Sequence, residues 1–292
     1  MEKAEFRARY ETERQAVDSF LQGLFTEKSD WNDLYDAMRY SLLAGGKRIR
    51  PVLTLEFARL AGAEWRPVLP AACALELVHT YSLIHDDLPC MDDDDLRRGK
   101  PSNHKVYGET LAVLAGDALQ PEAYRLILSA PGLGLRERAE CALLLSEASG
   151  AEGMVAGQVL DTLHAPGTEA ELRQVHRLKT GAMIAAACLM GCAAGGSGDK
   201  LWSAAGIYAR HLGIAFQIRD DLLDVIGDEA TFGKPIGSDR AEGKMTFVDL
   251  LGTEGCRQAV ADETRQAREA LCAFEGSEFL CCLAEELAVR EK

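Results

Sequence analysis

Six aspartates crowd one short stretch of the chain, DDLPCMDDDD, at positions 86, 87, 92, 93, 94 and 95. Asp86 directly follows an apolar segment, residues 81–84, so it projects from the end of a helix that we expect to be buried. So many carboxylates repel one another and destabilise a fold unless cations neutralise them. A run of charged residues is usually a solvated loop. The apolar helix that precedes these aspartates favours instead the interpretation that they form a cation site.

A second acidic cluster lies in the segment FQIRDDLLDVI. Asp220 and Asp224 are four residues apart, so on a helix they point from one face with Cβ atoms about 5–6 Å apart. Gln217 lies one turn earlier on that face, and the flanking residues are apolar, which an ordinary amphipathic surface helix does not explain. Carboxylate oxygens without a thiolate suit Mg²⁺, which typically bridges carboxylates to substrate phosphates.

Lysines and arginines recur beside both clusters, although the formal net charge is −14. GGKRIRP, residues 45–51, forms a turn that opens a helix, which is a natural site for an anion. The other basic residues follow the first cluster, lie between the clusters or follow the second: Arg97, Arg98, Lys100, Lys179, Lys234 and Lys244. Together they predict one polyanion held through a metal and another held by guanidinium and ammonium groups.

The composition argues against several classes of protein. The excess of acidic residues makes general nucleic-acid binding and attachment to anionic lipids unfavourable. The N-terminus is charged, and the longest nearly apolar run, residues 182–196, is shorter than the ~20 residues of a membrane helix. The nine cysteines form no C-x-x-C pair and are odd in number. We therefore expect a reduced, cytoplasmic protein without a stable membrane anchor.

Helical patterns run through nearly the whole chain, and Leu, Ala, Glu and Arg are abundant. No Pro- or Ser-rich linker divides the 292 residues. We expect one all-α domain, residues 1–292, with about ten or more helices. A capping box at Thr168 and Glu171 predicts the start of a long helix, and Pro121 is expected to kink a helix or start a new one. The principal predicted helices are 4–27, 31–44, 68–87, 110–129, 135–150, 153–163, 169–194 and 199–226, followed by a loop at 227–244 and two or more short helices within 254–290.

The motifs, taken together, resemble the trans-type polyprenyl diphosphate synthases, most closely those that make farnesyl diphosphate in bacteria. The matching segments run across most of the chain in the family's order: GGKRIRP (45–51), HTYSLIHDDLPCMDDDDLRRGKPSNH (79–104), GDAL (116–119), GQVLD (157–161), KTG (179–181), FQIRDDLLDVIGD (216–228) and GKPIGSDRAEGK (233–244). The resemblance implies the isoprenoid synthase fold, a single-domain helical bundle around a central cavity. It also implies a homodimer.

The same resemblance implies a Mg²⁺-dependent condensation. An allylic diphosphate (dimethylallyl or geranyl) ionises, and isopentenyl diphosphate attacks it head to tail, giving farnesyl diphosphate and free diphosphate. Three Mg²⁺ ions per active site would be held by carboxylates of both clusters: Asp86, Asp87, Asp92, Asp220, Asp221 and Asp224. The implied catalytic set is Asp86, Asp92, Arg97, Lys179, Asp220 and Lys234.

The basic residues divide, by resemblance, between the two substrates. The allylic diphosphate would contact Arg97, Lys179 and Lys234. Isopentenyl diphosphate would contact Lys47, Arg50, His79 and Arg98. Thr180 and Gln217 would place oxygen dipoles near the cation, and Lys244 would contact a diphosphate when the site closes.

The length of the product depends on what blocks the tunnel in which it grows. Tyr81 and Ser82 lie one turn before Asp86, so on a helix they face the same side. A bulky Tyr81 would stop growth early and favour the C15 product, although it could simply pack in the core. C20 and C10 products remain alternatives. A class I terpene cyclase and a non-catalytic synthase subunit are further alternatives, disfavoured by the two aspartate motifs and the full basic set.

Overall fold

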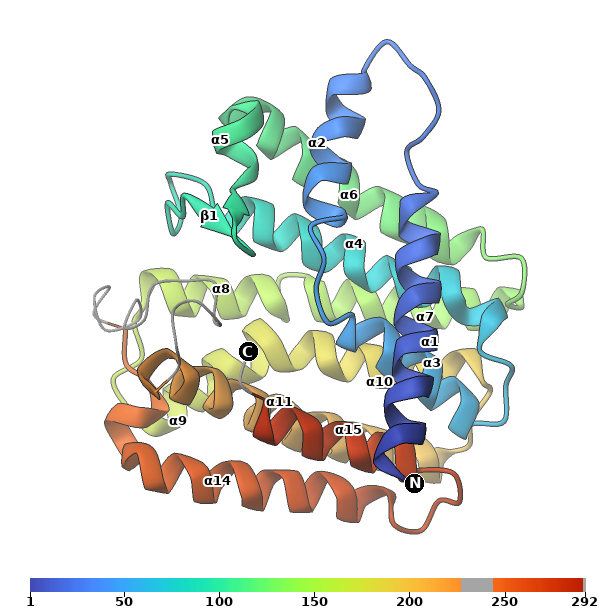
Figure 1. Ribbon diagram of the computed structural model, residues 1–292, viewed down its shortest axis with the longest axis vertical. Coiled ribbons are helices and arrows are strands. Elements are labelled where there is room, and N and C mark those ends of the chain that lie inside the picture. Colours follow the sequence, from blue (N-terminus) through green and yellow to red (C-terminus); the bar gives the residue numbers. More distant parts are fainter. Residues whose placement is uncertain (227–243, 291–292) are drawn as a thin grey trace.

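The computed structural model describes residues 1–226 and 244–290. Within them nearly all regular structure is helical, which confirms the all-α prediction (Figure 1). Two short turns, η1 (Arg66–Val68) and η2 (Arg177–Gly181), come directly before α4 and α10, and two tiny strands, β1 (Leu96–Arg97) and β2 (Lys100–Pro101), pair as a hairpin. The α-helices are α1 (Lys3–Gln22), α2 (Asn32–Leu42), α3 (Ile49–Leu60), α4 (Leu69–Asp86), α5 (Asn103–Tyr107), α6 (Glu109–Leu128), α7 (Leu135–Ser149), α8 (Met154–Leu163), α9 (Glu169–His176), α10 (Ala182–Ala194), α11 (Asp199–Ile226), α14 (Phe247–Leu271) and α15 (Glu278–Val289).

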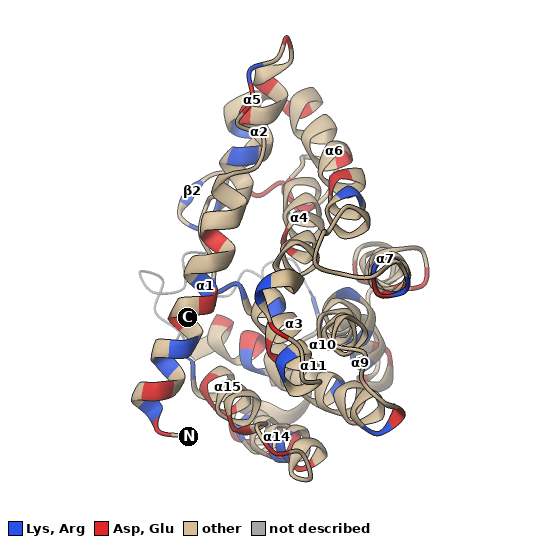
Figure 2. Ribbon diagram, turned by 90° about the vertical axis from the view of Figure 1, so that its right-hand side faces the viewer, with Lys and Arg blue, Asp and Glu red and all other residues tan. Residues whose placement is uncertain are grey.

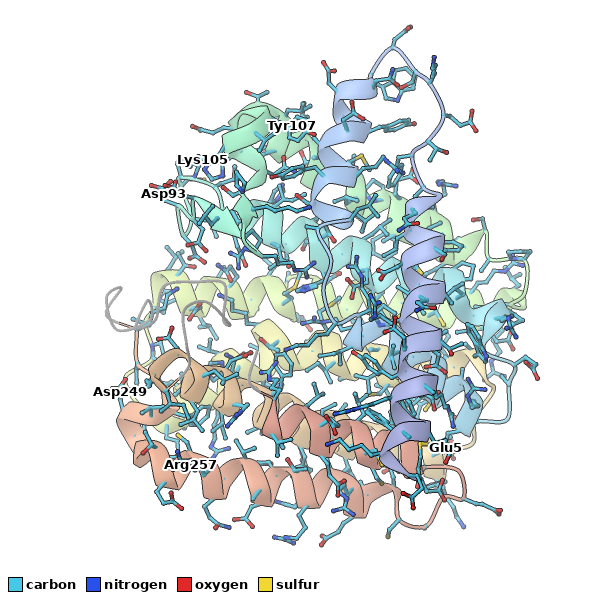
Figure 3. The ribbon with its side chains drawn as sticks, in the orientation of Figure 1. Glu5, Asp93, Lys105, Tyr107, Asp249 and Arg257 are labelled. Carbon is cyan, nitrogen blue, oxygen red and sulfur yellow. The ribbon has the colours of Figure 1, made fainter. Side chains whose placement is uncertain are left out.

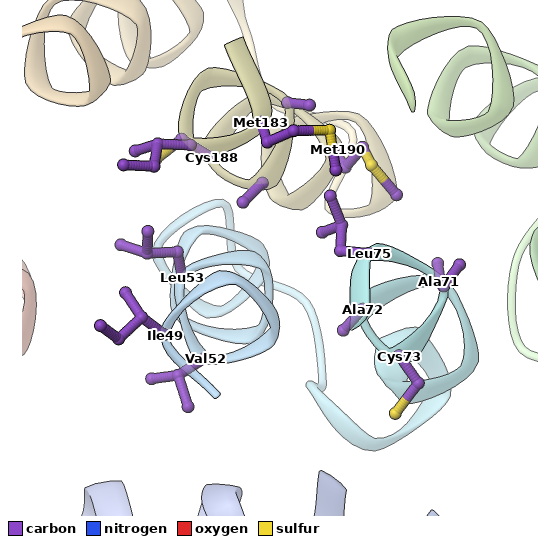
Figure 4. Packing of buried hydrophobic residues seen from close by; sticks show 14 of the residues in the cluster. Ile49, Val52, Leu53, Ala71, Ala72, Cys73, Leu75, Met183, Cys188 and Met190 are labelled. Carbon is purple, nitrogen blue, oxygen red and sulfur yellow. The ribbon is translucent and has the colours of Figure 1, made fainter. Parts of the chain in front are cut away.

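Helices α4 and α10 form the centre of the bundle. α4 packs against α3 and α6, and α10 packs against α3, α7 and α11. Both are apolar on most sides and rich in alanine, so neighbouring backbones approach closely. A Cβ on Gly191 of α10 would lie 2.4 Å from the carbonyl oxygen of Thr54 in α3, so only glycine permits this approach. Figure 4 shows the layer that results, with side chains of Ile49, Val52, Leu53, Leu75, Met183 and Cys188.

Most helices lie where the sequence pattern places them. The predicted helix 199–226 coincides with α11, and 68–87 corresponds to α4. The helix predicted at 169–194 starts at the expected residue, where the Thr168 hydroxyl accepts the backbone N–H of Glu171 at 3.3 Å. It continues as α9, η2 and α10, and η2 is a π-turn that helical periodicity does not reveal.

The expectation that a new helix could begin at Pro121 was wrong. α6 runs through Pro121 from Glu109 to Leu128, and no new helix begins there. Pro121 and Asp117 are both exposed, so the carbonyl that loses its N–H partner to the proline faces water. In the tail, the expected two or more helices within 254–290 are present: one runs from the break at Gly252 (φ 67°) to Leu271, and α15 follows it. The part of α14 before Gly252, which starts at Phe247 with a capping box of Thr246 and Asp249, was not expected.

Helix α1 lies across α3 and α4 (Figures 1 and 2), and ion pairs that involve buried carboxyl groups tie it to α3. Arg9 binds the Glu56 carboxylate through Nε at 2.8 Å, and Arg59 binds Glu13 at 2.7 Å. Glu13 and Glu56 are both almost completely buried and lie next to each other. Burial and the neighbouring Glu56 carboxyl group raise the pKa of Glu13 far above its usual range, so the folded protein binds a proton here.

This buried proton predicts a pH-dependent stability. An unfolded glutamate titrates near about pH 4.3, so between that pH and the raised value the folded state holds more protons than the unfolded chain. The contribution of Glu13 to the free energy of unfolding therefore falls as pH rises, by at most ~1.4 kcal/mol per pH unit. Glu13→Gln removes this loss, and we expect the Tm difference, variant minus wild type, to increase from pH 5.5 to 8.5 in thermal scans. A constant difference would contradict the assignment.

Two helical stretches, Arg66–Asp86 and Glu169–Ala194, are long and apolar enough to cross a bilayer by length and composition alone. The apolar window of the first is 67% buried inside the fold and that of the second 56%. Both include central helices of the bundle, α4 and α10, whose apolar surface is used in packing. Their hydropathy is therefore explained by the protein core.

Candidate active site

A cavity of about 500 Å³ opens between α4, α8 and η2. One part of its wall is apolar and comes from α8, with side chains such as Met154, Val155 and Val159. The rest of the wall brings together seven residues that the sequence predicts for the site, from α3, α4 and η2: Arg50, His79, Tyr81, Ser82, Asp86, Lys179 and Thr180. The cavity can thus hold a molecule with a charged head and an apolar tail.

The first aspartate motif begins at the last residue of α4 and folds back on itself. The backbone N–H of Asp92 donates to the carbonyl oxygen of Asp86 at 2.9 Å, which keeps the two residues close together. Burial at the cavity wall raises the pKa of Asp86 to about 6; Lys179 opposes this shift and Asp92 adds to it. Asp93, by contrast, is exposed at the surface near Lys105 (Figure 3). Asp86 is therefore the carboxyl of this motif whose environment most needs a cation.

Asp87 has a different environment from Asp86. It is buried, and Arg97 binds its Oδ1 through Nε at 2.8 Å, while the same guanidinium reaches Asp94 at 2.9 Å. Arg97 is part of the β1–β2 hairpin, whose turn residues Arg98 and Gly99 both have positive φ, 54° and 73°. Asp87 thus anchors the basic hairpin beside the acidic motif, a contact that the sequence reasoning did not anticipate.

The hairpin is joined to the basic turn before α3. The Arg98 guanidinium donates to the carbonyl oxygen of Gly45, and a Cβ on Gly46 would lie 3.0 Å from that guanidinium. Glycine at 46, where φ is 129°, therefore allows the two basic segments to touch.

Arg50 and Arg98 create an excess of positive charge in this corner, next to His79. The Nε of Arg50 is buried and has no hydrogen-bond partner among the residues that the structure describes. Burial, reinforced by Arg50 and Arg98, lowers the pKa of His79 far below its usual range, so the imidazole is neutral here. A buried N–H donor without an acceptor is unfavourable, and an anionic ligand would supply one.

A second cationic position comes from the π-turn η2. Lys179 Nζ lies 2.6 Å from Asp161 Oδ2 on α8, and the hydroxyl of Thr180 donates to Gln217 Oε1 at 3.0 Å. α8 approaches η2 so closely that a Cβ on Gly157 would lie 2.2 Å from the backbone nitrogen of Lys179. π-turns of this kind are frequent at functional sites. Asp161 was not among the predicted site residues, although it lies in the GQVLD segment.

The second aspartate motif lies at the C-terminal end of α11. Asp220 Oδ1 is 2.6 Å from Arg290 near the chain terminus, and burial raises its pKa while Arg290, Lys47 and Arg50 lower it. Asp220 nevertheless keeps 32% of its side-chain surface exposed. The contact with Arg290 was not predicted.

Asp221 and Asp224 are both buried. Asp221 Oδ2 accepts the backbone N–H of Phe247 at 2.8 Å, so it ties α11 to the start of α14. The sequence pattern predicts that Asp224 lies on the same helix face as Asp220. Asp224 is nevertheless buried, as Asp221 is, whereas Asp220 is partly exposed. Any metal role of Asp221 and Asp224 stays a prediction.

The two motifs border the same region of the molecule. Lys244, which follows the second motif, lies 3.7 Å from Asp92 of the first. The Thr180–Gln217 hydrogen bond joins the cavity wall to α11 one turn before Asp221. The predicted residue Lys234 lies outside the described residues.

The donor set fits magnesium when a second ligand is present. It consists of carboxylate oxygens, and the raised pKa of Asp86 reflects burial together with the nearby negative charge of Asp92. Within residues 1–226 and 244–290, no three His, Cys, Asp or Glu side chains gather closely enough to hold an ion alone. Mg²⁺ usually takes one or two carboxylates and completes its shell with water and substrate phosphate, which agrees with this arrangement.

Comparison with known proteins agrees with this geometry. The model of the family "Polyprenyl synthetase" matches residues 32–273. Farnesyl diphosphate synthase of Geobacillus stearothermophilus is 45% identical over 264 residues, covering 89% of each chain. The large subunit 1 of a heterodimeric geranylgeranyl pyrophosphate synthase from Arabidopsis thaliana is 43% identical over 88% of this chain and 72% of its own.

A solved structure of geranyltransferase from Helicobacter pylori, complexed with magnesium and isoprenyl diphosphate, superposes with a TM-score of 0.85 at 34% identity and covers 96% of each chain. The chain therefore belongs to the polyprenyl synthetase family and is a short-chain trans-prenyltransferase.

Proposed function

We propose that this prenyltransferase condenses isopentenyl diphosphate with dimethylallyl or geranyl diphosphate and releases farnesyl diphosphate. The observation that carries the proposal is one cavity whose acidic end, at Asp86, lies between two separate basic groups and continues into an apolar wall on α8. Two diphosphates and one growing hydrocarbon need these surfaces. The name of the Geobacillus relative supports the same product.

The carboxylates hold the metal in this proposal. Asp86 and Asp92 bind it from the first motif with Asp87 beside them, and Asp220 binds from the second, assisted by Asp221 and Asp224. Bound Mg²⁺ supplies electrostatic stabilisation of the charge that develops on the departing diphosphate. The Helicobacter geranyltransferase, which is complexed with magnesium, supports a metal at this place, and we propose three ions per site.

The basic residues orient the two substrates. Arg97, Lys179 and Lys234 hold the allylic diphosphate, and Lys244 reaches it from the second motif. Lys47, Arg50, His79 and Arg98 hold isopentenyl diphosphate in the corner where Arg50 Nε needs an acceptor. Fixing both substrates converts a bimolecular encounter into an intramolecular one, which is a large part of catalysis in such reactions.

Bond changes follow from this placement. The C1–O bond of the allylic diphosphate breaks and its electron pair leaves with the diphosphate. The double bond of isopentenyl diphosphate attacks the allylic cation, a C–C bond forms, and one proton is lost to restore a double bond. Thr180 and Gln217, joined by a 3.0 Å hydrogen bond, turn oxygen dipoles toward the cation.

We propose that Tyr81 stops chain growth. It is buried, lines the cavity, and packs edge to face on the His85 ring with centroids 5.8 Å apart. His85 is held from behind, because its Nε2 lies 3.0 Å from the Val113 carbonyl oxygen and a Cβ on Gly116 would overlap the ring. Tyr81 therefore rests on a rigid support. Ser82, which also lines the cavity, binds the His79 carbonyl at 2.9 Å.

We expect Tyr81→Ala to lengthen the product. Removal of the ring opens space beyond the C15 position, so C20 and longer chains should replace farnesyl diphosphate as the main product. Products from radiolabelled isopentenyl diphosphate are dephosphorylated and separated by chain length. Tyr81→Phe, which keeps the ring and removes only the hydroxyl group, is the matched control and should keep the wild-type distribution. An unchanged distribution in Tyr81→Ala would remove this role from Tyr81.

A C20 product is the second candidate, because several relatives of about 43% identity are named geranylgeranyl pyrophosphate synthases. Incubation of the enzyme and Mg²⁺ with each allylic starter, followed by identification of the alcohols, distinguishes C10, C15 and C20. Release of diphosphate without isopentenyl diphosphate would instead indicate a terpene cyclase. No turnover at all would indicate a non-catalytic subunit.

We also propose a single domain over residues 1–292, a homodimer and a cytoplasmic location. Helices from both ends of the chain share one core, since the rings of Phe6 and Phe279 lie 4.9 Å apart. An exposed apolar hollow between α2 and α6, lined by Trp31, Leu34 and Leu114, is available for a second copy of the chain. Sedimentation equilibrium tests the dimer.

The cytoplasmic location is supported by the cysteines. All nine are free, as in a reduced compartment.

A further inference from the structure

Arg48 occupies an unusual position between two predicted ligands of isopentenyl diphosphate, Lys47 and Arg50. It adopts the left-handed conformation, φ 54°, although it is not glycine. Such a backbone conformation is strained for a residue with a side chain and persists only where the surroundings hold it. Its side chain is 1% exposed and points into the protein, whereas Arg50 lines the cavity.

Three elements hold the Arg48 guanidinium, each through a different nitrogen. Nε donates to Asp18 Oδ1 of α1 at 2.9 Å, and Nη1 donates to Glu76 Oε2 of α4 at 2.8 Å. Nη2 donates to the carbonyl oxygen of Leu42 at the end of α2, also at 2.9 Å. The planar guanidinium group cannot turn without breaking at least one of these bonds, so the network fixes the backbone at residue 48.

Helix α1 holds the preceding residue as well. The hydroxyl of Tyr10 donates to the carbonyl oxygen of Lys47, so one turn of α1 contacts the backbone at 47 and another contacts the side chain at 48. α1 lies before residue 32, where the match to the family model begins. The match therefore assigns no role to Tyr10 or Asp18.

We propose that Tyr10 and Asp18 of α1 are positioning residues that hold the turn at residues 47–50 and thereby aim Lys47 and Arg50 at isopentenyl diphosphate. The inference rests on the proposed function, because it needs these two side chains to bind that substrate. Neither Tyr10 nor Asp18 lines the cavity, so both act through the turn. Because the turn does not contact the leaving diphosphate in this proposal, its displacement weakens binding of one substrate and leaves the chemical step intact.

Asp18→Ala tests the inference through the KM values of the two substrates. We expect the KM for isopentenyl diphosphate to rise about tenfold, as for loss of one charge-assisted hydrogen bond, while kcat and the KM for geranyl diphosphate change less than twofold. Tyr10→Phe should act in the same direction by about threefold, and Asp18→Glu should recover part of the loss. If Asp18→Ala does not fold, Tyr10→Phe decides the question.

Arg14→Gln is the matched control. Arg14 binds the other oxygen of Asp18 at 2.6 Å from the same helix and makes no contact with the turn. It should leave both KM values unchanged. Asp18→Ala and Tyr10→Phe variants that fold and keep the wild-type KM for isopentenyl diphosphate overturn the inference, and so does an equal rise in both KM values. A wild-type enzyme that does not elongate geranyl diphosphate overturns the proposed function, and this inference with it.

Discussion

Asp86→Asn should lower kcat by about 10²–10³-fold at saturating substrates and Mg²⁺, the loss typical when one group that stabilises developing charge is removed. Asparagine keeps the size of the side chain and a carbonyl oxygen but carries no negative charge. The burial that raises the pKa of Asp86 to about 6 makes its negative charge unfavourable unless a cation lies nearby. The charge is retained, in our interpretation, because the metal needs it. Turnover of geranyl and isopentenyl diphosphates across a Mg²⁺ titration measures the effect.

Asp93→Asn is the matched control for Asp86→Asn. It removes the same charge from the same cluster, but Asp93 is exposed and has φ 51°, a conformation that asparagine tolerates well. We expect turnover within about twofold of wild type, as for a surface charge. Equal losses in both variants would mean that the cluster acts only through its total charge. Full activity of a folded Asp86→Asn would exclude it as a metal ligand.

Much of the site could be predicted because its key residues follow local rules. Asp86 ends an apolar helix and Asp220 lies on another, and both features are visible in a few residues of sequence. The basic turn before α3 is equally local. The capping box at Thr168 predicted one helix start, whereas the similar one at Thr246 was overlooked, so the first part of α14, before its break at Gly252, was not expected.

The partners of these residues could not be predicted, because each comes from a distant part of the chain. Asp18 binds Arg48 across 30 residues, and Arg290 binds Asp220 across 70. Such pairs depend on how helices pack, and periodicity describes only which face of a helix is apolar. Local geometry also could not be predicted from the sequence where the backbone departs from a regular helix. The π-turn that presents Lys179 has no distinct pattern, and the hairpin at residues 96–101 is too short for strand periodicity.

Arg50→Met should reduce kcat/KM for isopentenyl diphosphate by about 10²-fold or more, since removing one member of a buried charge pair costs about 2–5 kcal/mol. The same change should leave the Tm unchanged or raise it. The Nε of Arg50 is buried without a hydrogen-bond partner among the described residues. Burial lowers the pKa of Arg50 and Arg98 adds to this shift, while Glu76 and Asp220 oppose it. Methionine retains the apolar part of the side chain and removes this unfavourable charge.

Arg59→Met should show the opposite pattern, and the contrast separates function from stability. Arg59 binds the buried carboxyl group of Glu13 at 2.7 Å and lies outside the cavity. Its removal leaves a buried acidic pair with less compensation, so the Tm should fall while both KM values remain unchanged. Thermal scans and initial rates on the two variants decide the matter. If Arg50→Met also lowers the Tm by several degrees and leaves KM unchanged, Arg50 stabilises the fold and the anion pocket must lie elsewhere.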